Sequence, residues 1–193
     1  MLKIDEIGAV TPRCVVRPVR DDDYVDFIAG YEYCLPSQNR FDDGRIDMSE
    51  HTKEWFSTLI DRRAGEAESD YCYMLHVFSK ETGRAIGYCD ITTQFRDDLQ
   101  YAKIGYTVFN NYWGKGYGTE IVQAIVKIGF EQLNFHRLEA HINLDNPASE
   151  AVVRKCGFCF EGVRRGFIFE DGHWVDHKVY YILNENWSPR AAT

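Results

Sequence analysis

The sequence lacks a long hydrophobic run, an excess of positive charge and any internal repeat. No apolar stretch approaches the roughly 20 residues of a membrane-spanning helix, and the N-terminal segment MLKIDEIGAV is too acidic for a secretory signal. The formal net charge of −8 disfavours nucleic acid as a partner, because phosphate binding requires a basic surface. We therefore expect no membrane and no nucleic acid among the partners, whereas a cationic amine suits the charge.

Nothing in the cysteine pattern indicates a disulfide framework. Six cysteines are scattered along a chain of 193 residues, which is too long to depend on disulfides for its stability. With no export signal, reduced thiols and a cytoplasmic location are expected. A hydrophobic content of 45% and an aromatic content of 15% predict a globular chain, and the length favours a single domain over residues 1–193.

One stretch imitates a metal site. From Cys156 to His177 the sequence reads C-x2-C-x13-H-x3-H, a spacing within the zinc-finger template. However, HWVDHKVYYIL has no helical period and is rich in β-branched and aromatic residues, so it favours a strand. On a strand, His173 and His177 would lie about 13 Å apart, too far for one ion whose ligand bonds are near ~2 Å. We predict no metal, and a redox role for Cys156 with Cys159 is disfavoured because the pair lacks a strand-to-helix setting.

Hydrophobic periodicity predicts an α/β fold, a mixed sheet with helices on both faces, in the order β-α-α-β-β-β-α-β-α-β-β. Two helices are expected between the first two strands, one after Asp21 and one around Trp55. A hairpin is expected around the Glu170-Asp171-Gly172 turn. The other predicted strands cover 14–20, 71–79, 84–92, 101–109 and 137–144, and the other predicted helices cover about 118–133 and 147–156.

The most informative run is IGYTVFNNYWGKGYGTEIVQAIV, residues 104–126. A strand ends, glycines follow at positions 114, 116 and 118, and a buried helix begins. Such glycines let backbone N–H groups converge on an anion, and the helix N-terminus adds about half a positive charge. The run fits neither the Walker A loop nor the Rossmann fingerprint. It predicts a diphosphate cradle, with a Gly-rich turn that holds no ligand as the alternative.

Three segments in order resemble the GCN5-related N-acetyltransferases (GNAT). YWGKGYGTE is similar to the acetyl-CoA loop of that family. LEAHINLDNPASEAVVRKCGF resembles the next strand and its Asn-led helix, and FEGVRRGFIFEDGHWVDHKVYYIL resembles the C-terminal hairpin of the branch that acetylates ribosomal-protein N-termini. The resemblance covers about residues 13–183. It implies a mostly antiparallel sheet split between strands 101–109 and 137–144, acetyl-CoA as acyl donor, and a possible homodimer.

The resemblance also assigns the cofactor contacts. The N–H of Val108 would bond the acetyl carbonyl and stabilise the oxyanion. Asn146 would contact the pantetheine arm, although its position before Pro147 also suits a helix N-cap. Backbone amides over seven consecutive residues would hold the diphosphate: Trp113, Gly114, Lys115, Gly116, Tyr117, Gly118 and Thr119.

The sequence marks the catalytic acid and the catalytic base less clearly than the cofactor contacts. Many relatives place a Tyr on the short helix as the acid, but Val153 stands at that position. The ribosomal-protein branch uses a Ser three residues after the Asn, which here is Ser149; its alternative is a cap of the first turn. His141 is the candidate base, with a satisfied strand histidine as the alternative. Ile168 stands where some relatives carry a carboxylate, so a water chain also remains open.

The resemblance therefore implies transfer of acetyl to a primary amine. The first choice of acceptor is a protein N-terminal α-amine. A polyamine or an aminoglycoside is the alternative small amine, and Val153 argues against the polyamine enzymes that use a Tyr acid. From another class, the chain could be an acyl-CoA-binding sensor without turnover.

Overall fold

The computed structural model describes residues 4–189, and within them eight strands form one sheet in the order β1-β2-β3-β4-β5-β6-β8-β7. Neighbouring strands are antiparallel, apart from the parallel pair β5 and β6. The sheet is thus mixed and mostly antiparallel, as expected. The strands are β1 (Ala9–Val10), β2 (Cys14–Arg17), β3 (Cys72–Ser79), β4 (Ala85–Phe95), β5 (Tyr101–Val108), β6 (Arg137–Asn143), β7 (Cys159–Glu170) and β8 (His173–Leu183).

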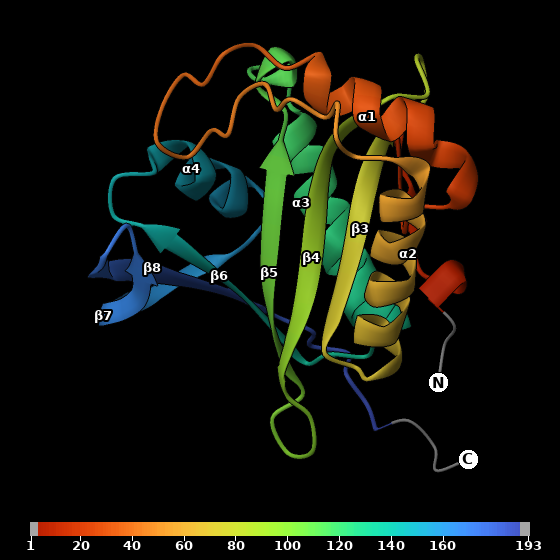
Figure 1. The fold of residues 1–193 in the computed structure, drawn as a ribbon. Helices are drawn as coiled ribbons and strands as arrows, with labels where there is room; N and C mark the ends of the chain where they lie inside the picture. The colour runs from red at the N-terminus through yellow and green to blue at the C-terminus, as the bar shows by residue number, and fades with distance from the viewer. Residues whose placement is uncertain (1–3, 190–193) are drawn as a thin grey trace.

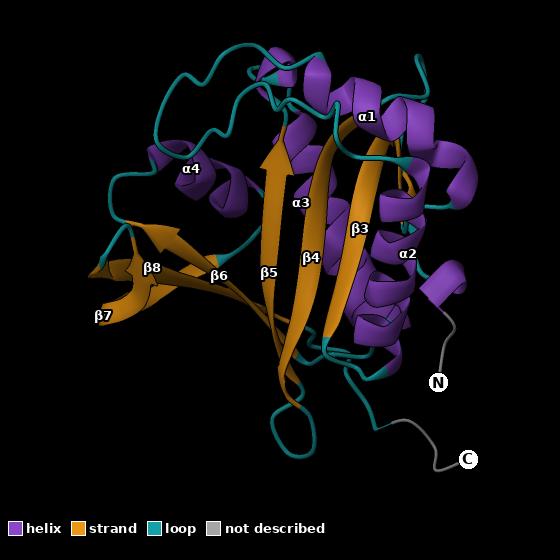
Figure 2. Ribbon diagram, in the orientation of Figure 1, coloured by secondary structure: helices purple, strands orange, loops and turns teal. Residues whose placement is uncertain are grey.

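Helices cover both faces of this sheet (Figure 2). The first two, α1 and α2, lie on one face, and α3 lies on the other (Figure 1). Three-residue 3-10 turns occur at Ile4–Glu6, Asp21–Asp23 and Asn110–Tyr112. The α-helices are α1 (Tyr24–Glu32), α2 (Lys53–Glu68), α3 (Tyr117–Lys127) and α4 (Pro147–Lys155).

The ends of two predicted strands were wrong, and the strand expected over 84–92 extends to Phe95. The strand expected over 14–20 ends at Arg17, because Pro18 has no N–H to continue the ladder. The helix expected over about 118–133 is present, as an α-helix to Lys127 and then as a π-helical turn, Ile128–Gln132. In that turn Gly129 approaches the sheet so closely that a Cβ would lie 2.8 Å from Leu138 Cδ1.

The predicted split in the sheet is present. The pairing of β5 with β6 is limited to three residue pairs, from Tyr101 with Arg137 to Lys103 with Glu139. Beyond these pairs β6 diverges from β5 and continues with β8 and β7 as a separate wing (Figure 1). The wing is held together by β8, which pairs with β6 along the whole length of β6. The second half of β5 therefore faces an opening in place of a neighbouring strand.

Two hydrophobic clusters hold the layers together. On the α3 face, Ile121 and Ile125 are fully buried with Leu138 and other strand residues. On the opposite face, Phe27 of α1 and Phe56 of α2 pack with aromatic residues of the sheet.

The C-terminal hairpin forms around Asp171 and Gly172, both of which have left-handed backbone angles (φ 50° and 83°) as a type I′ turn requires. His173 and His177 lie on β8, as the strand prediction required. His177 is buried, with Nε2 3.1 Å from a Glu170 carboxylate oxygen. Among residues 4–189 no cluster of three or more His, Cys, Asp or Glu side chains could hold a metal ion. Nor does any helix in this described part have the length and apolarity to cross a membrane.

Candidate active site

The glycine-rich loop leads from the end of β5 into α3. Gly114 and Gly116 have φ values of 71° and 81°. Residues that carry a side chain rarely adopt such positive backbone angles, so glycine is required at both positions. Residues 113–116 form turns, and within residues 4–189 none of the N–H groups from Gly114 to Thr119 makes a hydrogen bond of normal geometry. The Trp113 N–H differs, because it donates to Asn110 O at 3.3 Å. Six consecutive donors at the positive end of α3 form a site for an anion.

A salt bridge that the sequence did not indicate fixes this loop. Arg13 Nη1 donates to Lys115 O at 2.8 Å, while its Nε donates to Glu120 Oε2 at 2.7 Å. The guanidinium also lies 4.0 Å from the centre of the Tyr117 ring. Arg13 therefore holds the loop to the first turn of α3. Within the loop, the Lys115 ammonium donates to Asn111 O at 3.1 Å.

Val108 lies where β5 meets the split. The next residue, Phe109, donates its N–H to Ile86 O on β4 at 2.9 Å. Since N–H groups alternate in direction along a strand, the Val108 N–H points away from β4 and into the opening. Its carbonyl points the same way and accepts a 2.6 Å hydrogen bond from Trp113 Nε1. The N–H is thus presented to whatever enters the split.

Asn146 and Ser149 lie at the start of α4, on the other side of the split. Asn146 Oδ1 accepts the N–H of Ser149 at 3.0 Å, which confirms the N-cap geometry. Ser149 Oγ lies 2.7 Å from the hydroxyl oxygen of Tyr106, which comes from β5. Burial raises the pKa of Tyr106 to about 12, so this phenol stays protonated at neutral pH. The pair can supply a proton inside the split, and Tyr106 is a residue that the sequence reasoning missed.

His141 lies on β6 in a buried polar network. Its side chain is 3% exposed, and Nε2 lies 2.8 Å from Glu139 Oε2. The other ring nitrogen, Nδ1, is buried without a partner in the described part of the chain. Burial would raise the pKa of Glu139, but hydrogen bonds from His141, Tyr101 and Arg137 outweigh it and lower that pKa to about 2. This geometry disfavours direct proton transfer from a substrate to His141.

The loop between α1 and α2 passes over the end of β5 toward α4 (Figure 1). The buried Asn110 side chain fixes it, accepting the Leu35 N–H at 2.7 Å and donating to Leu35 O at 2.8 Å and to Asp42 Oδ2 at 3.0 Å. Near the tip of the loop, Arg40 makes two hydrogen bonds, of 2.9 and 2.5 Å, to Asp145 beside α4. The loop therefore bridges the two sides of the split.

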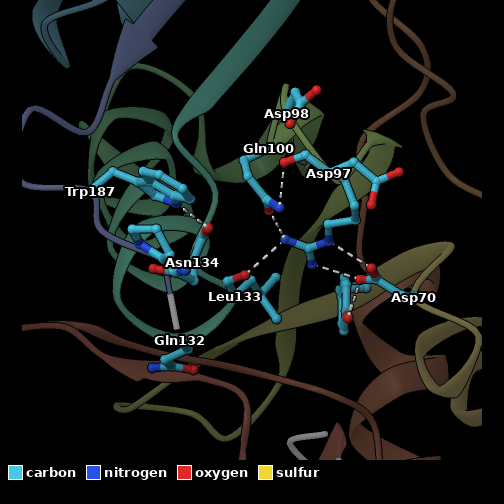
Figure 3. Close-up of a pocket in the computed structure, with 11 residues that line it drawn as sticks. Asp70, Asp97, Asp98, Gln100, Gln132, Leu133, Asn134 and Trp187 are labelled. Atoms are coloured by element: carbon cyan, nitrogen blue, oxygen red, sulfur yellow. Dashed lines mark hydrogen bonds and ion pairs between the residues drawn. The ribbon is translucent and has the colours of Figure 1, made fainter. Parts of the chain in front are cut away.

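A cavity of about 700 Å³ lies at the opposite end of the sheet, next to the start of β5. Figure 3 shows Asp70, Gln100 and Leu133 converging on one guanidinium, which belongs to Arg96. Arg96 donates to both Asp70 oxygens, at 2.6 and 2.7 Å, and so its charge is already neutralised. Because the glycine-rich loop and the Ser149 hydroxyl lie at the other end of β5, we do not assign the reaction to this cavity.

The split thus brings together an anion site, a strand N–H and a proton donor. These are the kinds of groups that acyl transfer from a phosphorylated carrier requires. Comparison with known proteins shows the family of the chain. The sequence profile of the acetyltransferase (GNAT) domain matches residues 13–159. The probable N-acetyltransferase YjcK of Bacillus subtilis is 38% identical over 117 residues, 61% of this chain and 65% of that protein.

Two further comparisons extend over nearly the whole chain. The [ribosomal protein uS5]-alanine N-acetyltransferase of Escherichia coli is 24% identical over 189 residues, 96% of this chain and 95% of that enzyme. The structure of Mycobacterium smegmatis RimJ in complex with CoA-disulfide has a TM-score of 0.75 at 22% identity, covering 94% of this chain and 88% of that one. At this identity the structural likeness concerns the fold.

Proposed function

The chain belongs to the acetyltransferase (GNAT) family, and from this premise we propose that it transfers the acetyl group of acetyl-CoA to the α-amine of a protein N-terminus. The observation that carries the proposal is the glycine-rich run Gly114 to Thr119, whose N–H groups make no hydrogen bond of normal geometry within residues 4–189, beside the N–H of Val108, which has no partner on β6. These residues suit a diphosphate and a thioester carbonyl, respectively. The amides of this run would hold the diphosphate, and Asn146 would contact the pantetheine arm near its own helix cap.

For the chemical step, the Val108 N–H would stabilise the negative charge that develops on the carbonyl oxygen as the amine attacks. Ser149, backed by Tyr106 at 2.7 Å, would return a proton to the departing thiolate. An α-amine suits this site because its pKa near ~8 requires little base strength, whereas a lysine amine near ~10.4 requires more. The role of His141 as the base remains a hypothesis from the sequence. The pH dependence of turnover by H141A tests it.

The acceptor is tested with an amine panel and mass spectrometry. A peptide with a free N-terminus, the same peptide with a blocked N-terminus and an internal lysine, spermidine and an aminoglycoside are each incubated with acetyl-CoA. We expect acetylation of the free N-terminus alone. Acetylation of spermidine or the aminoglycoside would replace this proposal with a small-amine enzyme. Thermal stabilisation by acetyl-CoA without any product would instead identify a sensor.

A further inference from the structure

The face of the sheet that carries α1 and α2 is polar where it borders the split. Registers pair Thr92 with Lys103, Asp90 with Gly105, and Tyr88 with Thr107, so the side chains of these residues share one face of β4 and β5. All six residues are half-buried, whereas the opposite face of the same strands is buried against α3. We call this set of six residues the polar strand face.

Asp90 is the carboxylate of the polar strand face. Thr92 Oγ1 donates to its Oδ2 at 2.8 Å, and within residues 4–189 nothing donates to Oδ1. Oδ1 lies directly over the next strand, where a Cβ on Gly105 would be only 2.2 Å away. The glycine therefore provides the space that the carboxylate occupies.

The charged groups around Asp90 leave its carboxylate able to accept a proton. Burial raises the Asp90 pKa, while Thr92, Lys103 of β5 and Arg63 of α2 oppose the rise. The other titratable groups that act electrostatically with this carboxylate are the Tyr88 phenol and the thiols of Cys72 and Cys89. No cation lies within ion-pair distance of Asp90 in the described part of the chain, so an oxygen remains available to a proton from outside.

The position of Asp90 relative to Val108 follows from the strand. Gly105, which faces Asp90, precedes Val108 by three residues, or about 10 Å along β5. The Thr107 hydroxyl lies on the same face between them. That gap suits proton transfer through the Thr107 hydroxyl and one or two waters.

We propose that Asp90, in place of the sequence candidate His141, is the base that takes the proton of the attacking amine, and this inference rests on the proposed acetyltransferase function. Ser149 and Tyr106 meet on the α4 side of β5, and Asp90 lies on the opposite face. The amine therefore enters from the polar strand face, and the thiolate leaves on the other side.

The proton balance is complete. The ammonium of the acceptor gives one proton to Asp90 and becomes a neutral amine, whose nitrogen forms a bond to the thioester carbon. When the C–S bond breaks, the thiolate takes the Ser149 proton. The amide nitrogen loses its extra proton, which restores the serine hydroxyl through water, and Asp90 releases its own proton to solvent.

The test is the pH dependence of kcat for D90N with a peptide α-amine. At pH 7 we expect a loss of about 100-fold. The loss should shrink above pH ~9, where the amine is neutral without a base. D97N is the matched control, because Asp97 is exposed on the loop before β5 and asparagine tolerates its left-handed backbone; its kcat should be unchanged.

A second variant tests Asp90 without removing it. T92V deletes the hydroxyl that lowers the Asp90 pKa. The acidic limb of the pH profile of kcat should therefore move to higher pH. A D90N defect that is equal at all pH values, or no defect, would overturn the inference, and so would an unshifted limb in T92V. Wild-type protein that binds acetyl-CoA but acetylates no amine would instead refute the proposed function itself.

Discussion

The substitution G116A tests most directly the proposed role of the glycine-rich loop in holding CoA. Gly116 has a φ of 81°, and an added Cβ would come no closer than 3.6 Å to Arg13 Nη2, so space is available and only the backbone angle opposes the change. Forcing an L-residue into the left-handed region costs roughly 1–2 kcal/mol. In the free protein the loop can relax to a negative φ, which turns the amides away from the diphosphate.

Binding of CoA must then restore the left-handed angle and supply that free energy. The dissociation constant for CoA should weaken about 5- to 30-fold, because 1.4 kcal/mol corresponds to a factor of ten. Isothermal titration calorimetry with CoA measures this change, and thermal unfolding measures what the substitution costs the free protein.

Gly172 provides the matched control. Its φ is 83° and a Cβ there would meet nothing within 4 Å, but it lies at the tip of the hairpin between β7 and β8. G172A should therefore lower the melting temperature and leave CoA affinity unchanged. Unchanged affinity in G116A, or an equal loss of affinity in G172A, would refute the assignment of the loop to the diphosphate.

Three further outcomes are expected. S149A should lower kcat about 100-fold at neutral pH, and Y106F should lower it less because the serine hydroxyl remains; equal kcat in wild type and S149A would refute the acid role. E139Q should lose stability on the order of 2 kcal/mol at pH 7, after allowance for solvent screening. Since the Glu139 pKa is about 2 in the fold and 4.5 ordinarily, this stabilisation is present above pH ~4.5 and is lost as the pH falls toward 2, so urea titrations of both proteins should converge in acid. G65A, at an exposed position in the last turn of α2, should raise stability by about 0.5–1 kcal/mol in thermal unfolding.

Features that depend on neighbours in sequence could be predicted. The glycines before α3, and the Asn146–Pro147 pair that begins α4, follow from local backbone rules, and the structure places them as expected. Such signals are short, and the tertiary structure has little freedom to override them.

Contacts between distant segments could not be predicted. Ser149 meets Tyr106 from 43 positions away, and this depends on the angle at which β6 leaves β5. The burial of His141 against Glu139 depends on the wing that β7 and β8 form. Arg13 reaches the cofactor loop across more than 100 residues, and no periodicity in the sequence encodes such a contact.

The anchoring of the α1–α2 loop has a consequence for how the acceptor range could diverge among relatives. At Leu35 and Pro36, the Asn110 amide bonds only to main-chain atoms, so substitutions of those two side chains leave these bonds intact. The path of the loop across the end of β5 therefore does not depend on the side chains at positions 35 and 36. Under the proposed function, the surface beside the split could change there while Asn110 keeps the loop in place.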